Sequence, residues 1–577
     1  MKEPTLIKQI EDDVRKAEVI SFDIFDTLLL RPYAKPQDLF WHIEKAYSRV
    51  GFCEERRAAE RRARLRHREL EDITYDMIYE EIDDKFKDLK QTETDWEKMV
   101  LRANPEMKKV YEYAKEQGKR IVIASDMYLP GVFIAEVLNQ NGYDGWDKLY
   151  VSGDINKCKG RGTLYSQILQ DMQIKPCDLL HIGDNKNSDY LKPKELGINT
   201  ILYDKVYERF LRDYNGRPIK ADTLGLSVLT AVLSMEALRD DRYSDFWKKI
   251  GSVYGGIACF TYMKWLQEQV VKDKIKDILF VARDGYVLKK VFDTFNTGIK
   301  THYIYAPRFL NLICTLDHKN DLEKLNMILK YYNQKGKIRG YKHFKHFGGA
   351  IKCFSRNYEQ ILEQSGEELR AYKKFLQKDG RFGKNIGVVD SYSWNFSALK
   401  LIQNTMPYKN VCGYFMQTSV DYTLKYQSLY DVDVKTQGIF KYWSFMELIM
   451  TSPEPPILTV CNNEVVYKKK LSKYETDRSK IYDSICAGIL DFANDMNDIF
   501  GKYGQVFLVE DLQNWINLLI DYPTDEEKRQ FSKIRHASDL KHCKYEHLFP
   551  FWYEGAKISI REKISYMIKR IYNKLWS

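Results

Sequence analysis

Residues 21–29 of this chain, SFDIFDTLL, hold the positions on which the fold and the site of its N-terminal part depend. The surrounding apolar run, 19–25, is short, as is typical of a buried strand. Asp23 lies near the end of that run, and Asp26 and Thr27 follow it. A carboxylate at a strand end can attack an electrophile or bind a metal ion, so this stretch predicts a reactive site.

Strand-like and helix-like segments alternate beyond this stretch. Further strands are predicted at 121–126 and 178–184, and helices at 104–120 and 162–174, the first ending near Gly118. This alternation predicts an α/β fold with a parallel, Rossmann-like sheet. Ligands of such sheets bind at the carboxyl ends of the strands, so the residues that follow each strand are the site candidates.

The first two predicted strands are separated by a long, polar and helix-rich segment, which we expect to form a helical cap over the site. Its charged helix, 54–72, has mixed signs, which indicates a solvated face; contact with an anionic substrate is the alternative. A second α/β region and a helical C-terminus are expected further on. The expected domains are 1–205 with a cap at about 33–103, a helical connector at 206–245, a second α/β domain at 246–460 and a helical region at 461–577.

Composition limits the classes of function. The 577 residues carry a net charge of +10, a mild excess that favours anionic or phosphorylated partners over a dedicated nucleic-acid-binding role. The ten cysteines form no CxxC pair, and the N-terminus lacks the apolar core of a signal peptide, so a reduced, cytoplasmic chain is expected. The longest uncharged runs, 223–235 and 250–263, fall short of the roughly 20 residues of a membrane-spanning helix, and we expect buried helices there.

Four short motifs occur in order along the first 200 residues, at or near predicted strand ends. Their residues are Asp23 with Thr27, then Ser125, then Lys159 with Lys157 as a rival, and finally Asp184 with Asp189 in GDxxxxD. This ordered set resembles the motifs of the haloacid dehalogenase superfamily, whose members are mostly phosphatases and phosphotransferases.

The resemblance implies a role for each residue. Asp23 would attack phosphorus and form an aspartyl-phosphate, which divides one difficult displacement into two easier steps. The carboxylate and the phosphate repel each other, and the positive charge of Mg²⁺ would offset this repulsion. Mg²⁺ suits the site because it prefers oxygen ligands. The implied ligands are Asp23, Asp184, Asp189 and the backbone carbonyl of Phe25. Ser125 would then bind a phosphoryl oxygen, and Lys159 would neutralise charge and position the nucleophile.

One position departs from the phosphatase pattern. The general acid/base usually stands two residues after the nucleophile, where this chain has Phe25, and the next carboxylate is Asp26, where the pattern often has glycine. Asp26 either reaches the leaving oxygen or caps the following turn. Three interpretations stay open: Asp26 or a cap residue supplies the proton, the leaving group needs little help, or the domain is a slow enzyme or a binding relic. The dehalogenases also lack this acid, but they use no metal and do not keep GDxxxxD.

The longer stretch 21–32, SFDIFDTLLLRP, resembles a bacterial subgroup of large predicted hydrolases associated with surface-polysaccharide and glycosyltransferase loci. This resemblance implies a phosphorylated sugar or glycan intermediate as substrate. It also leaves open a weakly active or non-catalytic scaffold in the same pathway.

The second half of the chain repeats the strand-then-carboxylate pattern only in part. Asp284 follows an apolar run, and Arg283, Arg308 and Asp390 are further candidates for a second pocket. A domain that binds a glycan or nucleotide-sugar and a structural or interaction domain are both compatible with this pattern. The basic, amphipathic tail at 555–577 either lies peripherally on an anionic inner-membrane surface or packs on its own protein.

Overall fold

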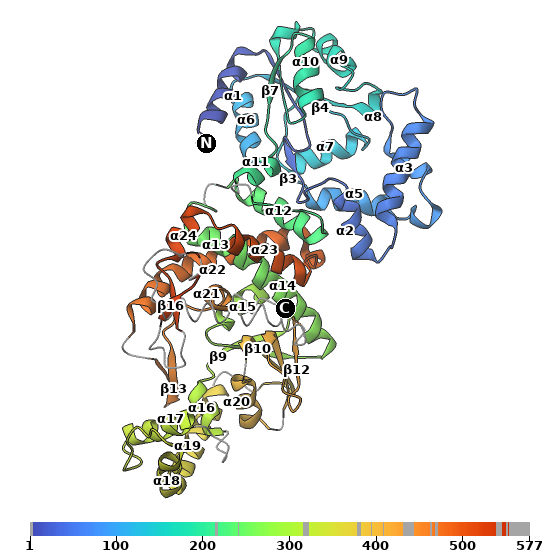
Figure 1. Cartoon of the computed structure of the whole chain (residues 1–577). Coiled ribbons are helices and arrows are strands. Elements are labelled where there is room, and N and C mark those ends of the chain that lie inside the picture. The colour runs from blue at the N-terminus through green and yellow to red at the C-terminus, as the bar shows by residue number, and fades with distance from the viewer. Residues whose placement is uncertain are drawn as a thin grey trace. The chain divides into compact units, whose positions relative to one another are not determined.

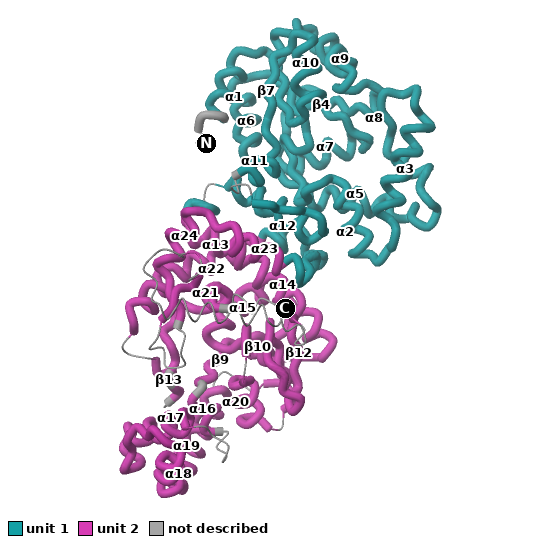
Figure 2. The backbone as a smooth tube through the Cα atoms, viewed as in Figure 1, with its two compact units in different colours: residues 1–244, 495–511 teal, residues 245–494, 512–577 magenta. Residues whose placement is uncertain are grey.

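The computed structural model describes most of the chain. The described residues are 4–213, 217–239, 242–314, 322–377, 382–393, 395–407, 409–430, 443–461, 464–467, 471–537, 545–549 and 552. The chain forms two compact units, of which the first combines 1–244 with 495–511 and the second combines 245–494 with 512–577 (Figure 2). The finer domain boundaries expected from the sequence stay a prediction.

The first unit is built around a five-stranded parallel sheet in the order β5-β4-β1-β6-β7. Its strands are β1 (Val19–Phe22), β4 (Arg120–Ser125), β5 (Lys148–Val151), β6 (Leu179–Gly183) and β7 (Asn199–Leu202). Strand β1 is central and fully buried, with β4 on one side and β6 on the other. The expected α/β class with a Rossmann-like parallel sheet is confirmed.

Helices connect these strands. They are α1 (Pro4–Lys16), α6 (Pro105–Glu116), α7 (Gly131–Gln140), α8 (Ser152–Ile155), α9 (Thr163–Met172) and α10 (Lys192–Glu195), with 3₁₀ and π turns at Pro176–Asp178 and Lys186–Leu191. The side chain of Asn104 caps the start of α6, where Pro105 needs no hydrogen-bond partner for its nitrogen. The helix ends just before Gly118, whose φ of +63° suits glycine, as the sequence predicted.

Four helices follow β1 and form the expected cap, which Figure 1 shows gathered on one side of the first sheet. They are α2 (Asp38–Tyr47), α3 (Phe52–Arg66), α4 (Tyr75–Glu80) and α5 (Leu89–Val100), with a 3₁₀ turn at Asp84–Phe86 and a short ribbon of β2 (Leu29–Leu30) and β3 (Arg102–Ala103) at the base. The same unit continues through α11 (Val206–Asp213), α12 (Leu224–Glu236) and a 3₁₀ turn at Gly501–Tyr503.

The second unit has its own parallel sheet, in the order β12-β11-β10-β8-β9. Its strands are β8 (Asp277–Val281), β9 (Lys300–Ile304), β10 (Asn385–Ser393), β11 (Asn410–Thr418) and β12 (Tyr426–Ser428). Its first helices are α13 (Phe246–Ile250), α14 (Ile257–Lys272) after a π turn at Gly251–Gly256, α15 (Gly285–Asp293), α16 (Arg308–Cys314), α17 (Leu322–Gln334), α18 (Phe347–Arg356), α19 (Tyr358–Leu376) and α20 (Ser397–Thr405). The expected second α/β region is confirmed.

The C-terminal part of the second unit is mainly helical, as expected. It contains α21 (Trp443–Ile449), α22 (Lys473–Phe500, which crosses into the first unit at Asp495), α23 (Val509–Asp521), α24 (Asp525–Phe531) and the hairpins β13 (Ile457–Cys461) with β14 (Glu464–Tyr467) and β15 (Arg535–Ala537) with β16 (Tyr545–His547). Among the described residues, no helix is long and apolar enough to cross a bilayer. The predicted basic tail, 555–577, lies outside the described residues.

Candidate functional site

Three of the predicted site residues meet at the carboxyl edge of the first sheet. Asp23 follows β1, Ser125 ends β4, and Asp184 follows β6. Because β4 and β6 both pair with β1, these three strand ends are neighbours. The backbone N–H of Asp23 donates to the carbonyl of Ile182 at 2.9 Å, which fixes the nucleophile candidate against β6.

Lys159 reaches this edge from the loop between α8 and α9. Its ammonium group forms ion pairs with the carboxylates of Asp23 and Asp189, the latter at 2.6 Å. The Asp126 carboxylate holds the loop in place by accepting the backbone N–H groups of Lys159 and Gly160 at 2.7 and 3.2 Å. The rival, Lys157, instead contacts Gln167. The structure therefore brings Lys159, and not Lys157, to the carboxylates.

Backbone groups next to Asp189 hold its carboxylate in place. It lies in the π turn Lys186–Leu191, and its carboxylate accepts the backbone N–H of Asn185 at 2.9 Å. A Cβ atom at position 183 would stand 2.6 Å from its carboxyl carbon, so only glycine permits this approach. The Gly of the GDxxxxD motif thus makes room for its last Asp.

His181 and Ser21 lie behind Asp189, and the sequence analysis missed both. His181 is fully buried on β6, with Nε2 3.2 Å from the Asp189 carboxylate and Nδ1 2.8 Å from the hydroxyl oxygen of Ser21. This chain of polar contacts continues through Asp189 to Lys159 and Asp23. The available signal was a polar residue inside an otherwise apolar strand, since buried polar groups need partners.

Asp26 faces a second lysine that the sequence analysis did not single out. The ammonium of Lys205 lies 3.2 Å from the carboxylate of Asp26 and 3.0 Å from that of Asp184. Asp26 has a φ of +60°, a left-handed conformation in which glycine is usual and Asp is tolerated. Its carboxylate thus lies at the same edge of the sheet as Asp184, beside the predicted metal ligands.

Phe25 cannot serve as an acid, and its ring is covered by a cation. The guanidinium of Arg31 stands 3.9 Å from the ring centroid and also binds Glu97, in cap helix α5, through hydrogen bonds of 3.1 and 3.2 Å. The Phe25 side chain is therefore part of a contact between the strand end and the cap.

Burial and the two lysines set the protonation of these groups. Burial raises the pKa of Asp23 well above its ordinary value, and Lys159 only partly offsets this. Burial also raises the pKa of Asp184, against the pull of Lys205. For Asp189 the cost of burial is outweighed by Lys159 and His181, which hold its pKa well below the ordinary value. The pKa of Lys159 is raised because Asp189 and Asp23 outweigh its burial.

The residues present fit a divalent cation. Asp23, Asp184 and Asp189 each offer a carboxylate oxygen, and these oxygens lie within 4.8 Å of one another. We call these three residues, together with Asp26, the carboxylate cluster. When all four are ionised, Lys159 and Lys205 leave two negative charges unbalanced, which matches one divalent ion. An all-oxygen donor set favours a hard cation of the Mg²⁺ type.

Two residues with buried hydroxyl groups, Ser125 and Thr27, end or follow strands of this sheet. The side chain of Ser125, at the end of β4, is buried and 2% exposed. The hydroxyl of Thr27 is buried too and, among the described residues, has no hydrogen-bond partner. A buried hydroxyl without a partner is costly, so a ligand oxygen next to Thr27 would satisfy it.

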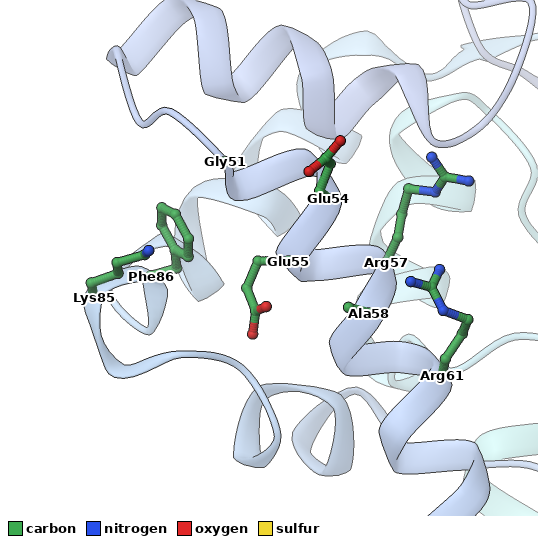
Figure 3. A pocket seen from close by; sticks show the side chains of 8 residues that line it. All are labelled: Gly51, Glu54, Glu55, Arg57, Ala58, Arg61, Lys85 and Phe86. Atoms are coloured by element: carbon green, nitrogen blue, oxygen red, sulfur yellow. The ribbon is translucent and has the colours of Figure 1, made fainter.

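A surface pocket on the cap lies apart from this cluster. Figure 3 shows it between α3 and the turn at 85–86, and its lining residues are Gly51, Glu54, Glu55, Arg57, Ala58, Arg61, Lys85 and Phe86. The sequence-predicted site residues are not among these described lining residues.

Fold and site together define an α/β protein with a buried carboxylate cluster at the carboxyl edge of a Rossmann-like sheet. No family model matches the chain, and no curated protein matches it.

Solved structures similar to part of the chain include one phosphatase and two dehalogenases by name. They are a predicted phosphoglycolate phosphatase from Haemophilus somnus 129PT, a dehalogenase with an intermediate complex, and the L-2-haloacid dehalogenase from Xanthobacter autotrophicus. The identities are 16%, 15% and 17%, over 32%, 32% and 40% of this chain and 85%, 84% and 91% of those chains, each with a TM-score of 0.25. Likenesses at this level carry no conclusion about the activity of this chain.

Proposed function

We propose that the first unit is a phosphatase or phosphotransferase that works through an aspartyl-phosphate on Asp23. The observation that carries this proposal is the ammonium of Lys159, buried between Asp23 and Asp189 at the strand ends. A carboxylate nucleophile must approach an anionic phosphate, and a fixed cation beside it lowers that repulsion. The arrangement supports attack by Asp23 on a phosphorus atom.

In the proposed reaction, a carboxylate oxygen of Asp23 forms a bond to phosphorus while the bond to the leaving oxygen breaks. Ser125 and Thr27 donate to phosphoryl oxygens, and Lys159 balances the charge around the nucleophile. The leaving oxygen takes a proton from the carboxylic acid form of Asp26, which becomes a carboxylate beside Lys205 at the same edge. Water, or an alcohol in a transferase, then attacks phosphorus and gives its proton to the Asp26 carboxylate, while the bond between phosphorus and the Asp23 oxygen breaks and the Asp23 carboxylate is restored.

Mg²⁺ is the proposed cofactor, held by Asp23, Asp184, Asp189 and the backbone carbonyl of Phe25. When bound, it supplies Lewis-acid stabilisation of the charge that develops on the phosphoryl group. For the substrate we propose a phosphorylated sugar or glycan intermediate, which is supported only by the resemblance of residues 21–32 to the polysaccharide-associated subgroup.

A weakly active or non-catalytic scaffold in surface-polysaccharide biosynthesis is the second candidate. It is favoured by Phe25, whose ring packs against Arg31 at the position where the usual acid would stand. If Asp26 does not supply the proton, turnover of poor leaving groups falls by about 10²–10⁴-fold.

The deciding experiment measures phosphate release from sugar phosphates and from an aryl phosphate, with Mg²⁺ or with EDTA. The variants are Asp23→Asn, Asp26→Asn and, as a matched control, Asp144→Asn, an exposed carboxylate paired with Lys115. An aryl group leaves easily, so it tests the nucleophile without requiring an acid. Asn tolerates the positive φ at position 26, so that variant is expected to fold.

We expect Mg²⁺-dependent turnover that disappears in Asp23→Asn and persists in Asp144→Asn. Asp26→Asn should lower turnover of sugar phosphates by about 10²-fold or more while largely sparing the aryl phosphate. Equal losses of turnover on both substrates would show that Asp26 is not the acid. Absence of turnover on every substrate, with the fold intact, would favour the scaffold.

A further inference from the structure

The chain adds strands first to one side and then to the other side of β8 in the second sheet. In open parallel sheets, such a change of side marks a ligand site. From β8 the chain passes to β9 on one side, and it then returns to β10 on the other side of β8. Ligands of open parallel sheets bind in the crevice at the carboxyl ends of the two strands on either side of such a reversal. In this unit the crevice lies between the ends of β8 and β10.

Polar side chains stand on both sides of this crevice. Ser391 of β10 donates a hydrogen bond to the carboxylate of Asp284, which directly precedes α15. Gly285 allows the turn after β8 to be short, because a Cβ there would lie 2.8 Å from the backbone of Phe280. Of the second-pocket candidates, Arg283 and Asp284 thus lie at the strand end, whereas the side chain of Arg308 lies outside the described residues.

Arg283, beside the crevice, also lines a pocket whose charged side chains have an excess of positive charge. The charged lining residues are Arg283, Arg478, Arg535, Glu447, Glu475 and His536. Among the described lining residues, three guanidinium groups therefore face two carboxylates, even with the imidazole neutral. All of these residues belong to the second unit.

Arg283 and Arg478 share one carboxylate oxygen. Oε2 of Glu475 lies 2.8 Å from Arg478 and 3.6 Å from Arg283, and the three side chains are only 8–15% exposed. Burial and the neighbouring guanidinium of Arg283 lower the pKa of Arg478, in spite of Glu475. Glu447 adds a second carboxylate near Arg478, but with Arg535 the described lining keeps one positive charge in excess, which a bound anion would offset.

Thr451 adds a hydrogen-bond donor to the same pocket. Its hydroxyl oxygen accepts from Arg478 at 2.7 Å and from Arg283 at 3.4 Å. Guanidinium groups only donate, so the proton of the Thr451 hydroxyl must point away from both. Together with the hydroxyl of Ser444, which also lines the pocket, the walls offer guanidinium and hydroxyl donors to one ligand.

We propose that the second unit holds a phosphate-binding site formed by Arg283, Arg478 and Thr451, and that its ligand is the phosphate group of a small phosphorylated molecule. A phosphate group has enough acceptor oxygens to receive two guanidinium groups and a hydroxyl at once. The site needs no metal ion and does not depend on the proposed function of the first unit.

The test is calorimetric titration of inorganic phosphate into the full chain, with EDTA present and ionic strength constant. EDTA removes the divalent ion that phosphate binding at the carboxylate cluster requires. We expect Arg283→Gln to weaken phosphate binding at least tenfold, and Arg356→Gln, at an exposed position on α18, to leave it unchanged. Asp23→Asn should also bind phosphate as the wild type does.

Any of four outcomes would overturn the proposal. They are absence of phosphate binding by the wild type, unchanged binding in Arg283→Gln, loss of binding in Asp23→Asn, and an equal affinity of the wild type for acetate. If circular dichroism shows that Arg283→Gln is unfolded, Thr451→Val decides instead, because it keeps every charge and removes one donor. Binding by Thr451→Val that equals the wild type would then count against the site.

Discussion

Lys159 and Asp189 form a 2.6 Å ion pair in which the two side chains are 3% and 1% exposed. The same ammonium also pairs with Asp23. Ions this deeply buried lose their hydration, and a buried pair is tolerated only while both partners are present. The pair therefore links the stability of the first unit to the electrostatics of the proposed active site.

Replacing Lys159 by Met should lower the free energy of unfolding of the first unit by about 3–5 kcal/mol, because two buried carboxylates lose their shared cation. The matched control is Lys157→Met, two residues away, whose side chain contacts Gln167 and not the carboxylates. We expect a change within about 1 kcal/mol for this control. Urea unfolding followed by far-ultraviolet circular dichroism measures both, and equal stabilities of the two variants would contradict the structure.

Divalent ions should stabilise the first unit through the carboxylate cluster. A ligand that binds only the folded state raises stability by about 2.7 kcal/mol at 100 times its Kd. Mg²⁺ should therefore raise the melting temperature of the wild type, and EDTA should reverse the change. Asp184→Asn should abolish the response, whereas Asp144→Asn should keep it. An unchanged Mg²⁺ response in Asp184→Asn would exclude a metal site at these residues.

A second buried ion pair holds the cap together. The guanidinium of Arg56, in α3, donates to both carboxylate oxygens of Glu93, in α5, at 2.8 Å each. Their side chains are 0% and 2% exposed. Arg56→Met or Glu93→Leu alone should lower the free energy of unfolding by about 3–5 kcal/mol, because each leaves a buried charge without its bidentate partner.

The double variant Arg56→Met/Glu93→Leu should recover much of that loss, because no charge stays unpaired. The exposed pair of Lys98 and Glu136 is the control, and its removal should cost at most about 1 kcal/mol. Strictly additive losses at Arg56 and Glu93 would show that the two side chains do not act as a pair.

Sequence reasoning found the strands that are buried along their whole length. The largely apolar segments that became β1, β6 and β8 carry a clear signal, because central parallel strands are buried on both faces. It did not identify β5 and β7, the edge strands of the first sheet. Their burial is partial and their side chains mixed, so no simple period marks them.

The site was predictable only where a residue belongs to a motif with a fixed place in the chain. Asp23, Lys159 and Asp189 do, and the structure brings them together. Lys205 is isolated in sequence, and a lone lysine is ordinarily a solvated surface residue. Its position beside Asp26 depends on where β7 ends, which the sequence does not show.

Arg56 illustrates the same limit within the cap. Residues 54–72 predicted a solvated helix face because their charges have mixed signs. Most of that helix is exposed or half-buried, but Arg56 is fully buried. Its partner, Glu93, lies 37 positions away, and a long-range pair of this kind leaves no mark in the local pattern.

The last prediction concerns His42, a buried histidine of the cap that should make the first unit sensitive to acid. Its Nε2 lies 3.0 Å from the carbonyl oxygen of Tyr503, which can only accept, so Nε2 carries the proton. Nδ1 then accepts the O–H of Tyr33 at 2.9 Å, and the Tyr33 oxygen accepts the indole N–H of Trp96 at 3.0 Å. A second proton on Nδ1 would break this chain of hydrogen bonds.

Burial lowers the pKa of His42 from 6.5 to about 4. The unfolded chain therefore binds more protons than the folded one between these two pH values. The contribution of His42 is complete above pH 6.5, and it is lost as the pH falls towards 4, to a total of about 3 kcal/mol. Between pH 7.5 and 5 the loss should be about 2 kcal/mol.

His42→Gln should flatten this part of the stability profile, because glutamine does not titrate. The control is His67→Gln, which changes a histidine at the cap surface beside Glu69 and should leave the profile of the wild type unchanged. Urea unfolding at pH 7.5 and pH 5 gives the free energies for all three proteins. If the wild type and His42→Gln lose the same stability over this interval, acid sensitivity of the first unit does not originate at His42.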